Sequence, residues 1–420
     1  MTGRTLSLLS GRLLPLTGPL VLSAAGLVAM VLVQQSATPA LFGLFAFCVV
    51  LSGFGQGLCN ALFATPLVVA LARTGERDNR LVPACVLAAL VLSGLTGILV
   101  WASAVLLGGP QTFALALGFW AGAAFLRWFF RSLDLALLAP SRAVRSDLLT
   151  GTLTLAGLVV LVLTGATGPA TVAKVMAGAM LLALGLAALA HRTALRSALK
   201  APLAPFITLT RQHGRWALLG VAGAEMAANG HAYVVTLVLG PAAFAPIALA
   251  TLLLRPFGVV LMALVGFERP ALADCLRRGA RLEADRRMEV LGRIAALAVA
   301  VNLLAAAGLV AVLPEIGGEG YSPSLLWTAL ALVSAGAVLR ALRTPQSVAL
   351  QAEGALRPLA MASLRAAPVA LGATLLVVLC APGLPALAAL GIVAGELALA
   401  AGIARAFGAK FSARERLADA

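Results

Sequence analysis

Charged residues are scarce in this chain, and their scarcity excludes most classes of soluble protein. Asp, Glu, Lys and Arg make up 11% of the 420 residues, whereas a soluble domain has about 25%. Hydrophobic residues make up 61%, and the mean hydropathy is +1.01. A water-soluble core of this size cannot bury that much apolar surface, so we expect a lipid bilayer to be the solvent of the chain.

Acidic residues are especially few. The chain has 16 Asp and Glu against 31 Lys and Arg, which gives a formal charge of +15. In a soluble protein this excess would indicate nucleic-acid binding. In membrane proteins the cytoplasmic loops collect Lys and Arg, so we expect no nucleic-acid partner.

The signatures of metal, redox and ATP chemistry are also missing. The five cysteines form no CxxC pair and are odd in number, so they predict neither a disulfide framework nor a metal site. There is no GxxxxGK[ST], HExxH or GxSxG motif. We therefore expect no catalytic residues, no cofactor and no enzymatic activity. A membrane-embedded transferase, or a non-transporting partner of a synthesis complex, remains a hypothesis from another class.

Long apolar stretches make up most of the sequence. Each is long enough to cross a hydrocarbon layer of about 30 Å as a helix. Backbone polar groups in lipid must be satisfied within the segment, which favours helices. The sequence thus predicts an all-α integral membrane protein with twelve transmembrane helices, near residues 13–33, 41–66, 81–107, 113–139, 148–165, 170–190, 216–239, 242–266, 291–313, 323–343, 359–380 and 386–405.

The connections between these helices alternate in charge. Those after odd-numbered helices contain no Lys or Arg, whereas those after even-numbered helices are all basic. The basic ones lie near residues 72–80, 140–147, 191–215, 267–290 and 344–358, and the C-terminal tail is basic as well. The positive-inside rule then predicts an inner (plasma) membrane protein with both termini in the cytoplasm.

The two halves of the chain share landmarks at a spacing of a little over two hundred residues. Gly11-Arg12 matches Gly214-Arg215, Thr38 to Phe42 matches Gly240 to Phe244, and Phe54-Gly55 matches Phe257-Gly258. Six helices per half is an even number, so the repeats are parallel, with a central cavity between them as the substrate path. The predicted domains are a six-helix repeat (1–190), a basic linker (191–215), a second repeat (216–406) and a tail (407–420).

Two repeat-equivalent regions carry a resemblance to a known family. TPALFGLFAFCVVLSGFGQGLCNALFATPLVVAL, from residue 38, resembles the helix 1–2 region of bacterial polysaccharide flippases. LGPAAFAPIALATLLLRPFGVVLMAL, from residue 239, resembles the matching region of their second half. These flippases are part of the multidrug/oligosaccharidyl-lipid/polysaccharide exporter superfamily.

The resemblance implies a flippase that moves a polyprenyl-diphosphate-linked oligosaccharide across the inner membrane by alternating access. The product would serve cell-surface or exopolysaccharide biosynthesis. The implied partners are the lipid-linked oligosaccharide, membrane lipids, a coupling ion (H⁺ or Na⁺) and a polysaccharide polymerase complex.

Arg127, Arg255 and Arg340 lie within predicted helices, where a charge is costly and is by default a functional candidate. Arg127 and Arg340 occupy repeat-equivalent positions, and Arg255 precedes Pro256, which suggests a kink or break. We expect the three guanidinium groups to bind an anionic headgroup through bidentate contacts. The alternatives are snorkelling for Arg127 and Arg340, and an ion pair with Glu225 for Arg255.

Two carboxylates are candidates for ion coupling, Glu225 and Glu396. Glu225, Asn229 and Tyr233 recur at i, i+4 and i+8 and should share one helix face. They favour an alternative function, a cation-coupled multidrug or small-solute antiporter. The multidrug and toxin extrusion branch of the superfamily has an acid on helix 1 or in a membrane-buried cluster. Helix 1 here has no acid, which argues against an organic-cation substrate.

Polar residues other than arginine complete the candidate site. Gln56 and Asn60, spaced i, i+4, either line the cavity or form hydrogen bonds between helices. The expected substrate-binding residues are thus Arg127, Arg255, Arg340, Gln56, Asn60, Asn229 and Tyr233.

Overall fold

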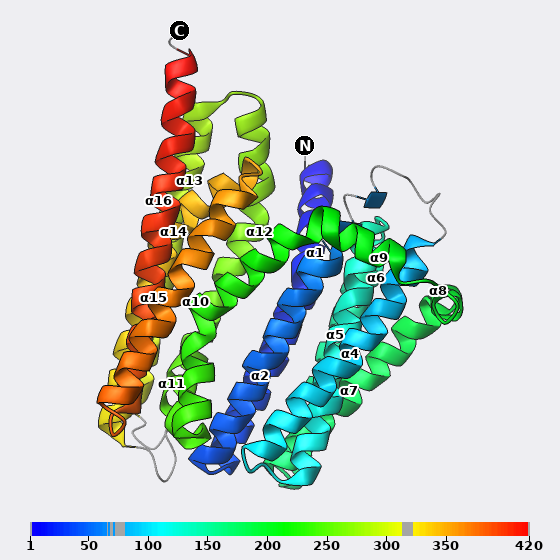
Figure 1. The fold of residues 1–420 in the computed structure, drawn as a ribbon, viewed down its shortest axis with the longest axis vertical. Coiled ribbons are helices and arrows are strands. Elements are labelled where there is room, and N and C mark those ends of the chain that lie inside the picture. Colours follow the sequence, from blue (N-terminus) through cyan, green and yellow to red (C-terminus); the bar gives the residue numbers. More distant parts are fainter. Residues whose placement is uncertain (1, 65, 68–69, 72–79, 313–321, 419–420) are drawn as a thin grey trace. The chain divides into compact units, whose positions relative to one another are not determined.

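The computed structural model describes residues 2–64, 66–67, 70–71, 80–312 and 322–418, and these form helices without any strand (Figure 1). Two predicted connections, the basic one at 72–80 and the one between the ninth and tenth predicted helices at 314–322, therefore lie almost entirely outside the described residues. The main helices are α1 (Thr2–Ser36), α2 (Pro39–Cys59), α4 (Leu81–Leu106), α5 (Gln111–Ala136), α6 (Pro140–Thr164), α7 (Pro169–Ala190), α10 (Arg215–Leu239), α11 (Pro241–Leu253), α12 (Arg255–Arg277), α13 (Arg281–Val312), α14 (Pro323–Ala352), α15 (Leu356–Cys380) and α16 (Leu390–Ala418).

All twelve predicted membrane segments correspond to helices. Among the described residues, ten helices are long and apolar enough to cross a membrane, and the bent pair α11 and α12 makes an eleventh span. The remaining predicted segment is α10, whose 25 residues extend over about 37 Å at 1.5 Å per residue. The chain is an integral membrane protein with the predicted all-α fold.

Several helices extend beyond the predicted membrane segments. The basic connection predicted at 267–290 is a helical hairpin, because α12 runs to Arg277 and α13 begins at Arg281. Likewise α14 continues through Pro345 to Ala352 and α15 begins at Leu356, so most of the connection predicted at 344–358 is helical. Hydropathy locates the apolar part of a helix, and it does not detect a helix that continues into water.

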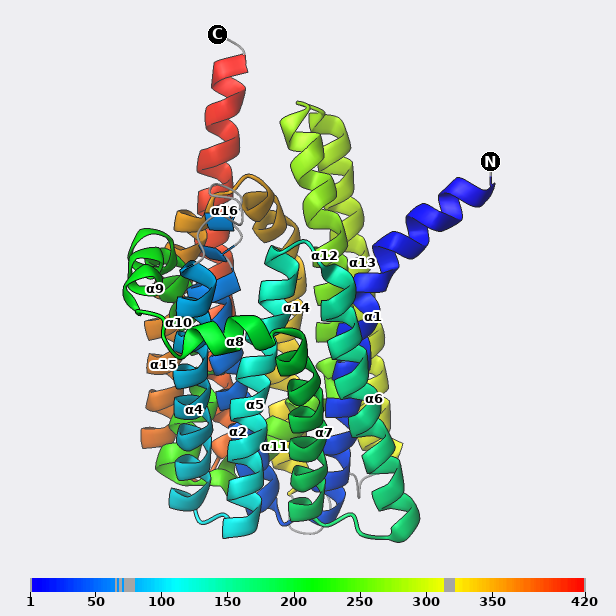
Figure 2. The ribbon, with the colours of Figure 1, turned by 90° about the vertical axis from the view of Figure 1, so that its right-hand side faces the viewer.

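The chain divides into two compact units, Met1–Leu218 and Leu219–Ala420. In the first unit α5 is the central helix and contacts α2, α4, α6 and α7, while α1 packs on α6 (Figure 2). The side chains of α5 are largely buried, among them Phe113, Phe125 and Phe129. A bilayer gives no hydrophobic drive for helices to associate, so close packing of this kind holds the unit together.

The second unit repeats these neighbour relations. Its central helix is α14, which contacts α11, α13 and α16 as α5 contacts α2, α4 and α7. The pair α15 and α16 corresponds to α6 and α7, and Gly220 and Gly223 of α10 lie against α15 as α1 lies against α6. The matching arrangement supports the two-repeat architecture that the sequence landmarks predict.

The segment between the repeats packs on the first unit. It contains α8 (Arg192–Ala198), α9 (Ala204–Leu209) and the π-helix η3 (Thr210–Gly214). Phe206 stacks on Phe63 with ring centroids 5.1 Å apart. The predicted linker is therefore anchored through an apolar face, while its basic side chains, such as Arg192, Arg196 and Lys200, are exposed.

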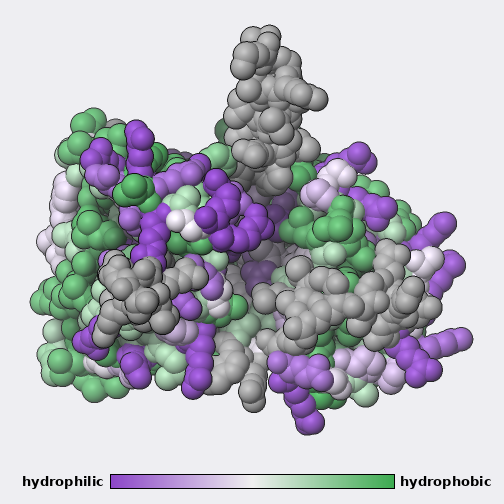
Figure 3. All heavy atoms as spheres, turned by 90° about the horizontal axis from the view of Figure 1, so that it is seen from above, coloured by the Kyte–Doolittle hydropathy of each residue, from purple (hydrophilic) through white to green (hydrophobic). Residues whose placement is uncertain are grey.

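Hydrophilic side chains are prominent in the view from above Figure 1, which is drawn in Figure 3. In the first unit the exposed basic residues include Lys200 and Arg211, and in the second Arg269, Arg277 and Arg286. Each unit thus exposes basic side chains in connections that the sequence predicts to be basic.

Glycines allow α4 and α5 to approach closely, and this contact yields a stability prediction. A Cβ at Gly97 would lie 2.9 Å from the carbonyl oxygen of Gly118, whereas Gly94, one turn away on α4, has open space around it. Gly97→Leu should destabilise the protein by about 1–3 kcal/mol, because backbone atoms cannot yield as a flexible side chain does. Thermal unfolding in detergent measures the effect, and Gly94→Leu is the matched control. Equal unfolding temperatures for the two variants would contradict the packing account.

Candidate functional site

A break in a membrane helix separates α11 from α12 in the second unit. The axes of α11 and α12 differ by 51°, and Arg255 and Pro256 are the first residues of α12. The Asn302 side chain on α13 bridges the break, since its amide nitrogen donates to the Leu253 carbonyl at 3.3 Å and its oxygen accepts from the Phe257 N–H at 3.2 Å. A helix break in lipid leaves backbone groups that must find such partners. The break predicted from Arg255-Pro256 is confirmed, and Arg255 itself is half-buried.

The predicted polar face of α10 is also present. The carboxylate of Glu225 accepts a hydrogen bond from the Asn229 amide at 3.1 Å and from the Tyr233 hydroxyl at 2.7 Å. All three side chains are partly buried. The i, i+4, i+8 spacing thus produces a carboxylate held by neutral donors, a site that suits a small cation or a proton.

An ion-pair network lies between α5 and α6 in the first unit. Arg127 Nη1 is 2.6 Å from Asp147 Oδ1, and Arg131 Nε is 2.8 Å from Asp147 Oδ2. The side chains of Arg127 and Asp147 are 4% and 1% exposed, and the Arg127 Nε has no hydrogen-bond partner among the described residues. Asp147 is covered by α1, where a Cβ at Gly18 would lie 2.5 Å from its own Cβ.

Polar contacts extend this network to α2. The Trp128 indole N–H donates to Asn60 Oδ1 at 2.8 Å, and the Arg131 guanidinium lies 4.9 Å from the centre of the Trp128 ring. Asn60 begins a short π-helix, η1 (Asn60–Ala64), a feature that often occurs at functional sites. For Asn60 the structure therefore shows the helix–helix hydrogen bond, while Gln56 is half-buried one turn earlier.

The second unit has its own network of two arginines and one carboxylate. Arg340 Nε lies 2.8 Å from Glu396 Oε1, and Arg343 Nε lies 2.6 Å from Glu396 Oε2. Glu396 is buried, at 3% side-chain exposure, whereas Arg340 is 39% exposed. Both oxygens of Glu396 are thus occupied, and a coupling ion at this carboxylate would have to displace a guanidinium.

The two networks are similar in chemistry and differ in construction. Each sets two arginines of the central helix against one buried carboxylate, so each holds one more positive charge than negative. Asp147 comes from α6 in the first unit, whereas Glu396 comes from α16, the equivalent of α7, in the second. Sequence reasoning did not single out Asp147. Asp147 stands next to a predicted span, but its partners Arg127 and Arg131 are 20 and 16 residues away, so no local signal in the sequence indicates the pairing.

A further buried carboxylate lies against the linker. Asp134 Oδ1 on α5 is 3.2 Å from Nε2 of His191. His191 stacks on Phe130 with 4.9 Å between ring centroids. These contacts join the linker to α5, while Arg131 pairs with Asp147.

Comparison with known proteins shows the fold of the chain. No family model and no curated protein matches the sequence. Among solved structures, an inward-facing multidrug resistance MATE family transporter of the MOP superfamily is similar, with a TM-score of 0.66 and 16% identity over 96% of this chain and 99% of that one. An outward-facing MATE structure matches with a TM-score of 0.61 and 16% identity, over 96% of this chain and 95% of that one.

A third similar structure is a MOP superfamily transporter from Pyrococcus furiosus. It matches with a TM-score of 0.59 and 15% identity, over 96% of this chain and 94% of that one. That protein is described as having a binding pocket of reverse polarity, which suggests a different function for it. The chain therefore has the MATE-type transporter fold, and at this identity its substrate has to be argued from its own residues.

Proposed function

Since the chain has the fold of the MATE transporters, we propose that it is a secondary transporter that works by alternating access. The same fold occurs in inward-facing and outward-facing structures of the similar transporters. Those proteins are transporters and not enzymes, in keeping with the absence of catalytic motifs. The protein would lie in the inner (plasma) membrane with both termini in the cytoplasm, as the basic connections predict.

The first candidate activity is export of a small organic solute coupled to H⁺ or Na⁺, with Glu225 as the coupling carboxylate. The observation that carries it is the contact of Glu225 with the neutral donors of Asn229 and Tyr233. A carboxylate held in this way can exchange a cation without breaking an ion pair. Glu396 is less suited, because Arg340 and Arg343 already bind both of its oxygens.

The second candidate is flipping of a polyprenyl-diphosphate-linked oligosaccharide. The excess of guanidinium groups in both networks favours an anionic substrate. Arg340, which is 39% exposed, can reach a diphosphate without leaving Glu396, whereas the buried Arg127 would need the first unit to open. Arg255, Gln56 and Asn60 would supply further polar contacts, and a polymerase complex would be the partner that consumes the flipped lipid.

A reconstitution experiment separates the two candidates. Purified protein in proteoliposomes should move a small organic dye, from a set of cationic, neutral and anionic ones, when an H⁺ or Na⁺ gradient is imposed, and it should not flip a polyprenyl-diphosphate glycan. Flipping of the glycan without dye movement would replace the first candidate by the second. Failure to move either compound would contradict both. Empty liposomes of the same lipid composition are the control.

A further inference from the structure

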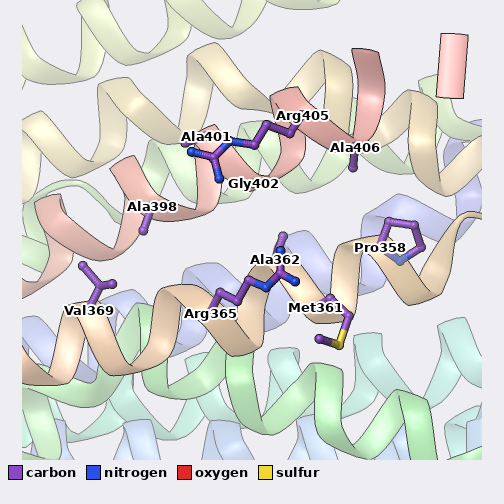
Figure 4. Close-up of a pocket in the computed structure, with 10 residues that line it drawn as sticks. All are labelled: Pro358, Met361, Ala362, Arg365, Val369, Ala398, Ala401, Gly402, Arg405 and Ala406. Carbon is purple, nitrogen blue, oxygen red and sulfur yellow. The ribbon is translucent and has the colours of Figure 1, made fainter. Parts of the chain in front are cut away.

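A groove runs between α15 and α16 on the second unit, away from the residues discussed above. It has a volume of about 450 Å³, and Pro358, Met361, Val369, Ala398 and Ala401 are among the residues that line it (Figure 4). The two helices approach closely here, because a Cβ at Gly402 would lie only 2.9 Å from that of Ala362. The small side chains of these residues thus leave the groove open and apolar at its base.

Two arginines, Arg365 and Arg405, converge over this groove (Figure 4). The helices are antiparallel, since Gly402 meets Ala362 while Gly395 meets Ala370. Side chains lean toward the N-terminus of their own helix, so Arg365 on α15 and Arg405 on α16 extend toward each other. The convergence follows from the register of the two helices.

Neither arginine is neutralised. In the described part of the chain, Arg365 and Arg405 form no ion pair, and no carboxylate lines the groove. Both side chains are exposed at the surface of the second unit. Two unpaired guanidiniums within a span are costly in lipid, and an anionic ligand between them would remove that cost.

The groove lies along the N-terminal half of α15. Arg365 is the tenth residue of α15, which places it about 14 Å from the start of that helix. The connection that precedes α15 is basic, and the positive-inside rule assigns it to the cytoplasmic side. Apolar side chains such as Val369 and Ala398 continue the groove toward the membrane centre. The two cations therefore lie between the ends of the groove, with Pro358 and Ala406 at one end and Val369 and Ala398 at the other (Figure 4).

We propose that this groove binds an anionic phospholipid of the cytoplasmic leaflet, with its phosphate between Arg365 and Arg405 and an acyl chain along the small residues of α15 and α16. Planar guanidinium groups contact phosphate oxygens in pairs. Basic pockets between membrane helices are a general way to hold such headgroups. The site is independent of the transported substrate.

Native mass spectrometry of the delipidated full-length protein tests the proposal. Phosphatidylglycerol should bind at least about tenfold more tightly to the wild type than to the Arg365→Ala/Arg405→Ala variant, since charge-assisted contacts are lost. The variant Arg269→Ala/Arg286→Ala removes the same charge from exposed positions of the same unit and should bind like the wild type. Ala401→Trp, which fills the groove and leaves both arginines, should also weaken binding.

Equal phosphatidylglycerol binding by the wild type and the Arg365→Ala/Arg405→Ala variant would overturn the proposal. Loss of binding in the Arg269→Ala/Arg286→Ala control would overturn it as well, because it would indicate a diffuse effect of charge. A third arm distinguishes a lipid from a soluble anion. Inorganic phosphate at millimolar concentration should not displace phosphatidylglycerol, and full displacement would show that the site holds a free anion.

Discussion

Glu225→Gln is expected to abolish gradient-driven transport while folded protein still reaches the membrane. Glutamine keeps the size of the side chain and can still bond to Asn229 and Tyr233, which contact Glu225 at 3.1 and 2.7 Å. It cannot carry the negative charge that binds a cation or a proton. The loss of charge-assisted contacts predicts a fall in transport rate of at least about tenfold.

Two further variants make the Glu225 experiment specific. Tyr233→Phe removes one neutral donor and keeps the carboxylate, so its transport rate should fall less than that of Glu225→Gln. Glu289→Gln changes an acid of α13 that is 59% exposed, and it should transport like the wild type. Dye transport in proteoliposomes under an imposed H⁺ or Na⁺ gradient measures all three. Wild-type transport by Glu225→Gln would end the assignment of Glu225 as the coupling group.

Asp147→Ala should be the most destabilising single substitution in the first unit. It leaves Arg127, whose side chain is 4% exposed, as a buried charge without its carboxylate. Removing one partner of a buried pair typically costs about 3–5 kcal/mol. Arg131 is less affected, because it is 17% exposed and lies over the Trp128 ring. We expect a large fall in unfolding temperature in detergent and less monomeric protein after extraction.

The double variant Arg127→Met/Asp147→Leu separates a structural role from a substrate role. Apolar side chains of similar size can replace a buried ion pair at little cost, so stability should return close to that of the wild type. Asp285→Ala, at an exposed position of α13, is the control for loss of an acid. A double variant as unstable as Asp147→Ala would contradict this account. A stable double variant that no longer transports would support the predicted substrate contact of Arg127.

Much of the fold could be predicted because it depends on local properties of the sequence. The lengths of the apolar stretches predicted the twelve segments, and the dipeptide Arg255-Pro256 predicted the break between α11 and α12. The face shared by Glu225, Asn229 and Tyr233 followed from helical periodicity alone. None of these inferences needs a partner from elsewhere in the chain.

The partners of the charged groups could not be predicted, because they are distant in sequence. Arg340 and Glu396 are 56 residues apart, and Asn302 reaches Leu253 across 49. Helix neighbours set these pairs, and several packings of twelve apolar helices would satisfy the same composition. Arg365 was overlooked within a predicted span, since only the register of α15 against α16 brings it toward Arg405.

Alternating access is the central claim, and spin-label distances between the two units test it most directly. In a variant whose native cysteines are replaced, including the exposed Cys380, one label pair would sit at Lys200 and Arg286, at the ends with basic connections. A second pair would sit at Thr112 and Pro382, at the opposite ends; all four positions are exposed. Adding the coupling ion or the substrate should change the two distances in opposite directions. Distances that stay constant, or that rise and fall together, would contradict alternating access.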